Sequence, residues 1–214
     1  MRPLVREFAE LAATTLPIPE PVYEFGAFQV EGQEDLINVR ELFPGKEYYG
    51  CDMRPGKGVD KILNLHHIDI PDDSVGTVLL FDTIEHVEYP HKALNEVFRI
   101  LKPGGICIVA APMYFPIHNH PYDYWRFTPE AFRSLLKPFE QVFVGQAGKE
   151  DFPHTVVGIA KKGTEPFPPD LQTRYERWQQ VWSTSKRSSW KLLLDLLVPP
   201  LLLASSRKKI LKDS

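Results

Sequence analysis

The segment VGTVLLFDTIEHVEYPHKALNEVFRILKPGGICIVAAP, residues 75–112, decides the fold of this chain. It opens with an apolar run, Val75 to Phe81, which predicts a strand buried on both faces of a parallel sheet. Apolar residues then recur at helical spacing from Ala93 to Leu101. Lys102-Pro103-Gly104-Gly105 ends that helix, because proline cannot continue it and glycine permits the reversal. Ile106 to Ala111 predicts the next buried strand. The order strand, helix, strand indicates a parallel α/β sheet.

The rest of the chain continues this alternation. The pattern predicts a leading helix with Leu4, Phe8, Leu11 and Ala12 on one face, strands at 22–25, 47–51 and 61–63, a helix with Leu36, Val39, Arg40 and Phe43 at helical spacing, a helix starting at Thr128-Pro129, and a terminal pair of strands at 139–146 and 155–160. Thr128 is a favourable N-cap, with proline at the first helical position. Strands separated by helices imply right-handed crossovers and a mainly parallel sheet.

Length and composition describe a globular protein. The chain has 214 residues, of which 43% are hydrophobic and 25% charged, as expected of one domain with appendages. Residues 186–214 carry seven basic and two acidic residues, a charge of +5, which leaves −8 for residues 1–185 out of the total of −3. An acidic body argues against a nucleic-acid partner. Cys51 and Cys107 fall in predicted buried strands, without the spacing of a metal or disulfide framework.

The two ends of the chain suggest where the protein works. Glu7 and Glu10 interrupt the N-terminal segment, which argues against a signal peptide and for a cytoplasmic location. We expect a domain at 1–162, followed by a linker and a helical, amphipathic tail at 163–214. The leucine-rich run 190–204 is too short to span a bilayer. Its basic flanks suit peripheral contact of residues 190–212 with an anionic membrane. Packing of its leucines on the domain or on a second subunit is the alternative.

Three motifs resemble those of S-adenosylmethionine (SAM)-dependent methyltransferases of class I, in particular the type 11 branch. They are Asp82-Thr83-Ile84-Glu85-His86-Val87, the helix and turn from Ala93 to Gly105, and Pro121-Tyr122-Asp123-Tyr124-Trp125-Arg126-Phe127-Thr128-Pro129-Glu130. The resemblance covers roughly residues 20–162. It implies a Rossmann-like, doubly wound, mainly parallel seven-stranded sheet with an antiparallel last strand. It also implies SAM as cofactor and methyl transfer to a small acceptor, for which we expect an oxygen of a glycan, quinone or lipid-linked compound.

The resemblance places the cofactor on three loops. The segment Glu24 to Gly32 stands for the family's glycine-rich loop, in which Glu24 and Gly26 match while Phe28 and Val30 replace the second and third glycines. A carboxylate that ends the second strand can accept both hydroxyls of a ribose. Asparagine and leucine follow the third strand where such enzymes hold the adenine. The implied cofactor-binding residues are Glu24, Gly26, Phe28, Asp52, Met53, Asn64, Leu65, Asp82 and Thr83.

Candidate catalytic residues follow the strand at 75–81 and the strand at 106–111. Asp82, Glu85 and His86 share one face of a helical turn, at i, i+3 and i+4. His86 can act as a general base, the three can bind a divalent cation as in the similar ubiquinone-pathway O-methyltransferases, or Glu85 and His86 can serve packing alone. The loop 113–128 belongs to the acceptor side in this family. The candidate catalytic residues are Glu85, His86, His118, His120 and Asp123.

Two other classes of protein compete with a methyltransferase. A non-catalytic scaffold would explain the altered glycine loop, although Asp52 and the Asp82 cluster are intact. An NAD-dependent oxidoreductase would require Gly-x-Gly-x-x-Gly after the first strand. The Phe28 side chain occupies the approach that a diphosphate would need, which argues against that class.

Overall fold

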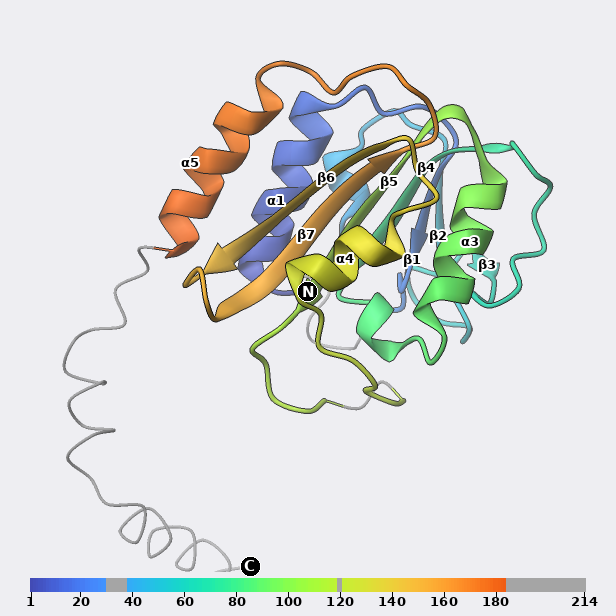
Figure 1. The fold of residues 1–214 in the computed structure, drawn as a ribbon. Helices are drawn as coiled ribbons and strands as arrows, with labels where there is room; N and C mark the ends of the chain where they lie inside the picture. Colours follow the sequence, from blue (N-terminus) through green and yellow to red (C-terminus); the bar gives the residue numbers. More distant parts are fainter. Residues whose placement is uncertain (30–37, 119–120, 184–214) are drawn as a thin grey trace, which may run out of the picture. The chain divides into compact units, whose positions relative to one another are not determined.

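A seven-stranded sheet forms the centre of the computed structural model, which describes residues 1–29, 38–118 and 121–183 (Figure 1). The strand order is β3-β2-β1-β4-β5-β7-β6. Strands β1 to β5 pair in parallel, whereas β7 runs antiparallel to both β5 and β6. This is the predicted Rossmann-like sheet with its antiparallel last strand. The strands are β1 (Val22–Phe25), β2 (Tyr48–Asp52), β3 (Lys61–Ile62), β4 (Val75–Phe81), β5 (Leu101–Pro112), β6 (Gln141–Gly148) and β7 (Pro153–Lys161).

The described residues form helices before, between and after the strands. They are α1 (Pro3–Thr15), α3 (Pro90–Ile100), α4 (Pro129–Leu135), α5 (Leu171–Ser183) and the short 3-10 helices η1 (Arg40–Leu42) and η2 (Ile84–His86). The Thr128 hydroxyl accepts a hydrogen bond from Ala131 N at 3.2 Å, as predicted for an N-cap. The helix predicted through Leu36 to Phe43 lies partly outside the described residues, and its described part contains only η1.

Strand β5 begins earlier than predicted. Leu101 pairs with Val75, and pairing resumes at Ile106 opposite Thr77 after an irregular stretch. Helix α3 ends at Ile100, just before residues 102–105, as predicted. These residues do not form a separate turn, however, but an irregular stretch within β5. Gly104 has a φ of +82°, a conformation that favours glycine.

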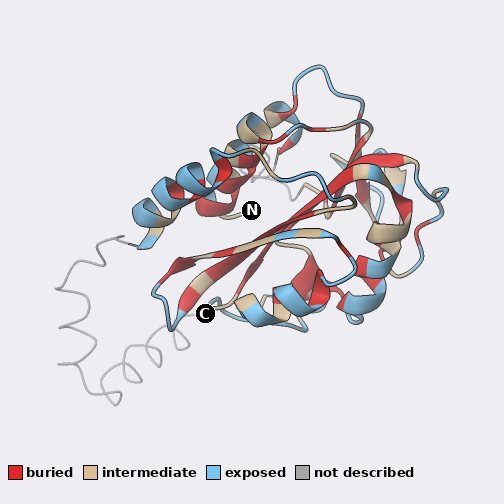
Figure 2. Cartoon of the chain, turned by 45° about the horizontal axis from the view of Figure 1, so that its top comes forward, coloured by how far each residue is buried: buried red, intermediate tan, exposed pale blue. Residues whose placement is uncertain are grey.

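Each face of the sheet packs against its own pair of helices. One hydrophobic core joins the sheet to α3 and α4, and the other joins it to α1 and α5. Figure 2 shows the buried residues in the strands and on the sides of the helices that face them. Cys51 and Cys107 are buried, and burial raises the pKa of each thiol to about 12. They are core residues.

Helix α5 belongs to the compact unit, which runs from Met1 to Ser183. The Trp178 indole donates to Leu4 O at 3.0 Å, and its ring centroid lies 5.3 Å from that of Phe8. The unit therefore extends beyond the predicted boundary at Lys162, because an aromatic face of α5 is buried against α1. The leucine-rich run and its basic flanks lie outside the described residues. No helix in residues 1–29, 38–118 or 121–183 is long and apolar enough to cross a membrane.

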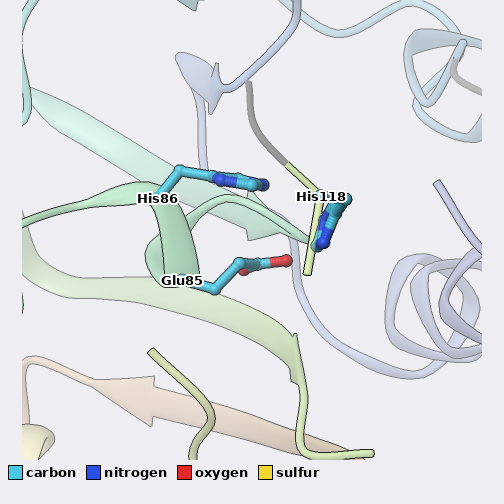
Figure 3. A group of neighbouring side chains, drawn as sticks. All are labelled: Glu85, His86 and His118. Atoms are coloured by element: carbon cyan, nitrogen blue, oxygen red, sulfur yellow. The ribbon is translucent and has the colours of Figure 1, made fainter. Parts of the chain in front are cut away.

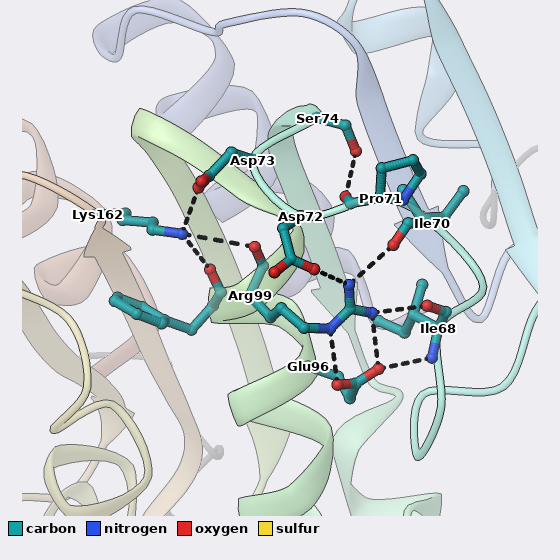
Figure 4. Close-up of polar contacts among 10 residues, drawn as sticks. Ile68, Ile70, Pro71, Asp72, Asp73, Ser74, Glu96, Arg99 and Lys162 are labelled. Atoms are coloured by element: carbon teal, nitrogen blue, oxygen red, sulfur yellow. Dashed lines mark hydrogen bonds and ion pairs between the residues drawn. The ribbon is translucent and has the colours of Figure 1, made fainter.

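The loop between β3 and β4 is held to α3 by one arginine. The Arg99 guanidinium donates to Ile68 O at 2.7 Å and Ile70 O at 2.9 Å, and it pairs with Asp72 and Glu96 (Figure 4). Glu96 also accepts from Ile68 N at 2.9 Å. Backbone groups of this loop thus bond to the side chains of Arg99 and Glu96, and not to a neighbouring strand.

Substitution of Glu96 by Gln tests this anchor. The hydrogen bond from Arg99 lowers the pKa of Glu96 from 4.5 to about 2, so its stabilisation is complete above pH ~4.5 and disappears as the pH falls toward ~2. We expect Glu96→Gln to lower the free energy of unfolding by about 1 to 3 kcal/mol at pH 7, and by less at pH 3. Urea titrations at both pH values measure this. Glu130→Gln, at an exposed pair with Arg133, should change stability at neither pH.

Candidate active site

A cavity of about 800 Å³ opens at the carboxyl ends of β1, β2 and β4. Strand β1 leads to β2 on one side, while β4 lies on its other side, so the strand order reverses here. Open α/β sheets bind ligands at such a switch point, and the volume suits a small molecule. The cavity is lined by residues 1, 2, 24–26, 28, 39, 52–54, 63, 65, 66, 81–83, 85–88, 112, 115, 118, 121, 122 and 124.

Gly26 allows the ends of β1 and β4 to come together. Its φ is +85°, and a Cβ at this position would collide with the Thr83 hydroxyl. That hydroxyl lies 3.0 Å from Phe25 O and 3.0 Å from Phe81 O, the last residues of the two strands. One glycine and one threonine thus set the floor of the cavity.

Glu24 lies buried beside this floor and bonds to the neighbouring strand. Its carboxylate accepts a hydrogen bond from the Tyr48 hydroxyl at 2.7 Å. Burial raises the pKa of Glu24 to about 7, although the Tyr48 bond acts in the opposite direction. Glu24 therefore changes its charge close to neutral pH.

The end of β2 presents a carboxylate to the cavity. The Asp52 side chain is 11% exposed, and its Oδ1 accepts from Arg54 N at 2.9 Å and Arg54 Nε at 3.3 Å. The Phe28 ring lies against this turn, with the Arg54 guanidinium carbon 4.5 Å from the ring centroid. Phe28 stands at the sequence position of the family's second glycine, and its ring packs on the turn after β2. Met53 also lines the cavity.

The segment after β3 contributes an apolar wall. Leu63 and Leu65 line the cavity, and Leu65 is buried. Asn64, predicted to contact the adenine, is exposed and is not among the lining residues. Its Oδ1 accepts from His66 N at 2.9 Å, so the amide side chain stabilises a local turn.

An arginine from the start of α1 engages the carboxylate at the end of β4. Arg2 Nη2 lies 2.6 Å from Asp82 Oδ1, and Arg2 N donates to Asp82 Oδ2 at 3.2 Å. Arg2 Nη1 also bonds to Thr155 Oγ1 at the start of β7. Asp82 itself has a φ of +48°, a strained conformation for a residue other than glycine. Arg2 therefore joins α1, β4 and β7 at the cavity.

Glu85, His86 and His118 also line the cavity, where they lie close together (Figure 3). The Glu85 side chain is completely buried, and its carboxylate oxygens have no hydrogen-bond partner among the described residues. Burial, and then the charge of Asp82, raises the pKa of Glu85 well above its usual value. One ligand atom from each of the three side chains lies within 4.8 Å of the others. The predicted set of Asp82, Glu85 and His86 is thus replaced by one in which His118 stands instead of Asp82.

The loop after β5 is tied to the segment that carries Glu85. Tyr124 N and Trp125 N donate to Glu85 O at 2.9 and 3.1 Å, and the Trp125 indole donates to Val87 O at 3.0 Å. Asp123 does not line the cavity. Its carboxylate, 1% exposed, pairs with Arg126 at 2.5 Å and accepts from His118 N at 2.8 Å. Asp123 therefore shapes the loop behind His118. His120 lies outside the described residues.

Sequence reasoning missed several lining residues. Phe115 and Tyr122 lie in the loop 113–128, which was expected on the acceptor side, but they were not named as site residues, and Arg2 comes from a segment without any site motif. The one local signal at Arg2 is its place just before Pro3, the first residue of α1. Only the packing of α1 against the sheet brings it to Asp82.

The strand order, the glycine turn and the cavity at the switch point define the class I SAM-dependent methyltransferase fold. The resemblance seen in the sequence is therefore confirmed. Residues 39–109 match a family described as methyltransferase domain, and this segment includes Asp52, Asp82, Glu85 and His86.

Curated relatives align over part of this chain. The ubiquinone/menaquinone biosynthesis C-methyltransferase UbiE of Bartonella quintana is 35% identical over 66 residues, 30% of this chain and 25% of that protein. The protein of the same name from Brucella canis is 26% identical over 110 residues, 48% of this chain and 41% of that protein. The chain thus aligns with less than half the length of these relatives.

Solved structures share the fold at low sequence identity. A SAM-dependent methyltransferase from Archaeoglobus fulgidus has a TM-score of 0.58 at 15% identity, covering 76% of this chain and 95% of that one. The Burkholderia thailandensis 1,6-didemethyltoxoflavin-N1-methyltransferase, solved with bound 1,6-didemethyltoxoflavin and S-adenosylhomocysteine, has a TM-score of 0.53 at 15% identity, covering 74% of this chain and 78% of that one.

The raised pKa of Glu24 predicts that the free energy of unfolding decreases as Glu24 ionises. The unfolded chain ionises Glu24 near pH 4.5 and the folded chain near pH 7, so stability should fall as the pH rises between these values, by about 3 kcal/mol at most. Glu24→Gln keeps a partner for Tyr48 and removes the charge. Urea titrations from pH 4.5 to 8 should show a smaller decline for this variant than for the parent. An identical decline in both would mean that Glu24 does not ionise in this range.

Proposed function

We propose that this chain is a SAM-dependent methyltransferase that acts on a small acceptor. One observation carries the proposal. A single cavity at the switch point holds the Asp52 carboxylate on one wall and Glu85, His86 and His118 on another. Residues suited to bind the cofactor and residues suited to catalysis therefore line the same cavity. The matched family and the shared fold support the same activity.

The lining residues fit SAM along its length. Asp52 would accept the ribose hydroxyls, as an acidic residue at the end of a second strand does in dinucleotide folds. Leu63 and Leu65 would cover the adenine. The α-ammonium group would lie toward Asp82 and the α-carboxylate toward Arg2, because this pair presents both signs of charge. The backbone at Gly26 would pass closest to the cofactor, since no side chain stands there.

The chemistry requires alignment and removal of a proton. SAM, when bound, supplies a methyl group on a sulfonium that is already a good leaving group. The protein then has to hold the acceptor in line with the methyl group and take up the acceptor's proton. Glu85, His86 and His118 are the titratable groups placed for the second task.

Exposed apolar residues near the cavity suggest the kind of acceptor. The loop after β5 carries exposed large hydrophobic residues, and Phe152 lies beside it with its ring centroid 4.7 Å from that of Tyr114. The exposed set is Tyr114, Phe115, Ile117, Tyr122, Tyr124, Trp125 and Phe152. Such a surface suits an acceptor with an apolar tail. Compared with a glycan or a lipid-linked compound, a quinol fits this surface best, with its hydroxylated ring near His86.

An oxygen or a ring carbon of the acceptor can receive the methyl group. The expected transfer to oxygen has no support in the comparisons, since the quinone-pathway relatives are named C-methyltransferases. Deprotonation of a phenol raises electron density on its oxygen and on the adjacent ring carbon. The same catalytic group can therefore serve either outcome.

Calorimetry with Asp52 variants tests the cofactor assignment. Loss of hydrogen bonds to a charged group costs about 1.5 to 3 kcal/mol, so Asp52→Ala should weaken SAM binding roughly 10- to 150-fold. The exposed Asp69 provides a matched control, and Asp69→Ala should bind like the parent. SAM and S-adenosylhomocysteine should bind the parent, while NAD should not. Equal SAM affinity in Asp52→Ala and the parent would refute the assignment.

A second experiment tests the reaction part of the cavity. With a short-chain quinol as probe, His86→Ala should lower kcat by about 100-fold or more, as expected for loss of proton transfer. Its affinity for SAM should change little. His91→Ala removes an exposed imidazole from α3 and should retain the parent's rate. Mass spectrometry of the product identifies the methylated atom. If His86→Ala turns over as fast as the parent, His86 has a packing role only.

A further inference from the structure

We propose that Glu85, His86 and His118 form a binding site for one divalent transition-metal ion on the acceptor wall of the cavity. Figure 3 shows the three side chains directed toward one another, from η2 and from the loop after β5. Carboxylate and imidazole groups together are ligands for zinc, iron and other first-row metals.

The buried carboxylate of Glu85 is the strongest indication of a bound cation. A completely buried carboxylate ordinarily has a hydrogen-bonded or charged partner, because burial of an unpaired charge is costly. Neither oxygen of Glu85 has a hydrogen-bond partner among the described residues. The Arg2 guanidinium, which also lines the cavity, is bonded to Asp82. A metal ion beside Glu85 would supply the missing charge.

Both imidazoles are oriented as metal ligands usually are. His86 Nδ1 lies 2.6 Å from Tyr122 O, and His118 Nδ1 lies 3.2 Å from Pro116 O. A carbonyl oxygen only accepts hydrogen bonds, so Nδ1 carries the proton on each neutral ring. The tautomer therefore presents Nε2 as the ligand atom, and metal-binding histidines commonly donate their other N–H in this way.

Asp123 completes the support of His118. Its Oδ2 lies 3.2 Å from His118 Nδ1, and Arg126 holds the same carboxylate in place. A carboxylate behind a histidine ligand orients the ring and raises its basicity. This arrangement explains why a residue predicted to be catalytic stands behind the cavity wall instead of on it.

The spacing requires only a small contraction. The three ligand atoms lie within 4.8 Å of one another, whereas ligands of a tetrahedral ion with bonds of about 2.1 Å lie about 3.4 Å apart. Movement of the widest pair by about 1.4 Å, through side-chain rotation, would close the site. Two imidazoles disfavour magnesium and calcium, which prefer oxygen ligands. The described residues supply three ligands, which would leave a fourth position of a tetrahedral ion for the acceptor.

The open position gives the metal a role that rests on the proposed function. An acceptor hydroxyl bound to the ion would lose its proton near neutral pH, because a divalent cation lowers the pKa of a bound hydroxyl. With the ion bound, the three side chains would hold it and would not take up the proton themselves. The proton would then leave to solvent, and the activated oxygen or adjacent carbon would attack the methyl group. Metal binding itself does not depend on this role.

Cobalt titration of the tag-free full chain tests the site. After removal of bound metal, the protein should bind one Co²⁺ ion. The bound ion should give a visible absorption band of the kind seen when Co²⁺ has few ligands, here nitrogen and oxygen atoms, and Zn²⁺ should displace it. Glu85→Gln and His118→Ala should each weaken Co²⁺ binding by at least about tenfold. His91→Ala, which removes an exposed imidazole outside the cluster, should bind like the parent.

Thermal unfolding gives an independent readout. Zn²⁺ should raise the Tm of the parent and of His91→Ala, since a ligand of the folded state stabilises it, but not that of Glu85→Gln. Without metal, Glu85→Gln should be at least as stable as the parent, because a buried amide avoids the cost of ionising an unpaired carboxyl group. Absence of cobalt absorption in the parent, or equal absorption in all four proteins, would overturn the metal site. SAM titration of the same preparations shows separately whether the proposed function holds.

Discussion

The close contact between the ends of β1 and β4 is the constraint on which the rest of the site depends. The Thr83 hydroxyl bonds to the last carbonyl oxygen of both strands, and only a residue without a Cβ fits at Gly26 beside it. Because the strand order reverses between these two strands, their contact forms the floor of the cavity. Asp52 on one side and Asp82 on the other take their positions from it.

Charge around this floor is distributed by segments that are distant in sequence. Arg2 neutralises Asp82 at the end of β4, while Tyr48 satisfies one oxygen of the buried Glu24. Glu85, one turn beyond Asp82, has no such partner among the described residues. Glu24, Asp82 and Glu85 therefore have different electrostatic surroundings, and Glu85 is the one of these whose environment favours an added cation or a proton.

The loop after β5 links the structure of the cavity to its chemistry. Its backbone donates to Glu85 O through Tyr124 and Trp125, so the loop and η2 form one unit. Asp123 and Arg126 give that loop its internal shape. His118 is thereby held opposite His86, and the aromatic residues of the loop remain exposed. A compact polar interior with an apolar exterior suits a hydroxylated ring that carries an apolar tail.

The sequence by itself determined the sheet, most strand positions, the capped start of α4 and the cofactor edge, because burial periodicity and turn residues act over short distances. Gly26, Asp52 and Asp82 were expected there, and all three line the cavity. Only the tertiary structure decided that Arg2 engages Asp82, that His118 joins Glu85 and His86, that Asn64 turns away and that α5 packs on α1. Each of these depends on contacts between residues far apart in the chain, for which local spacing carries no signal.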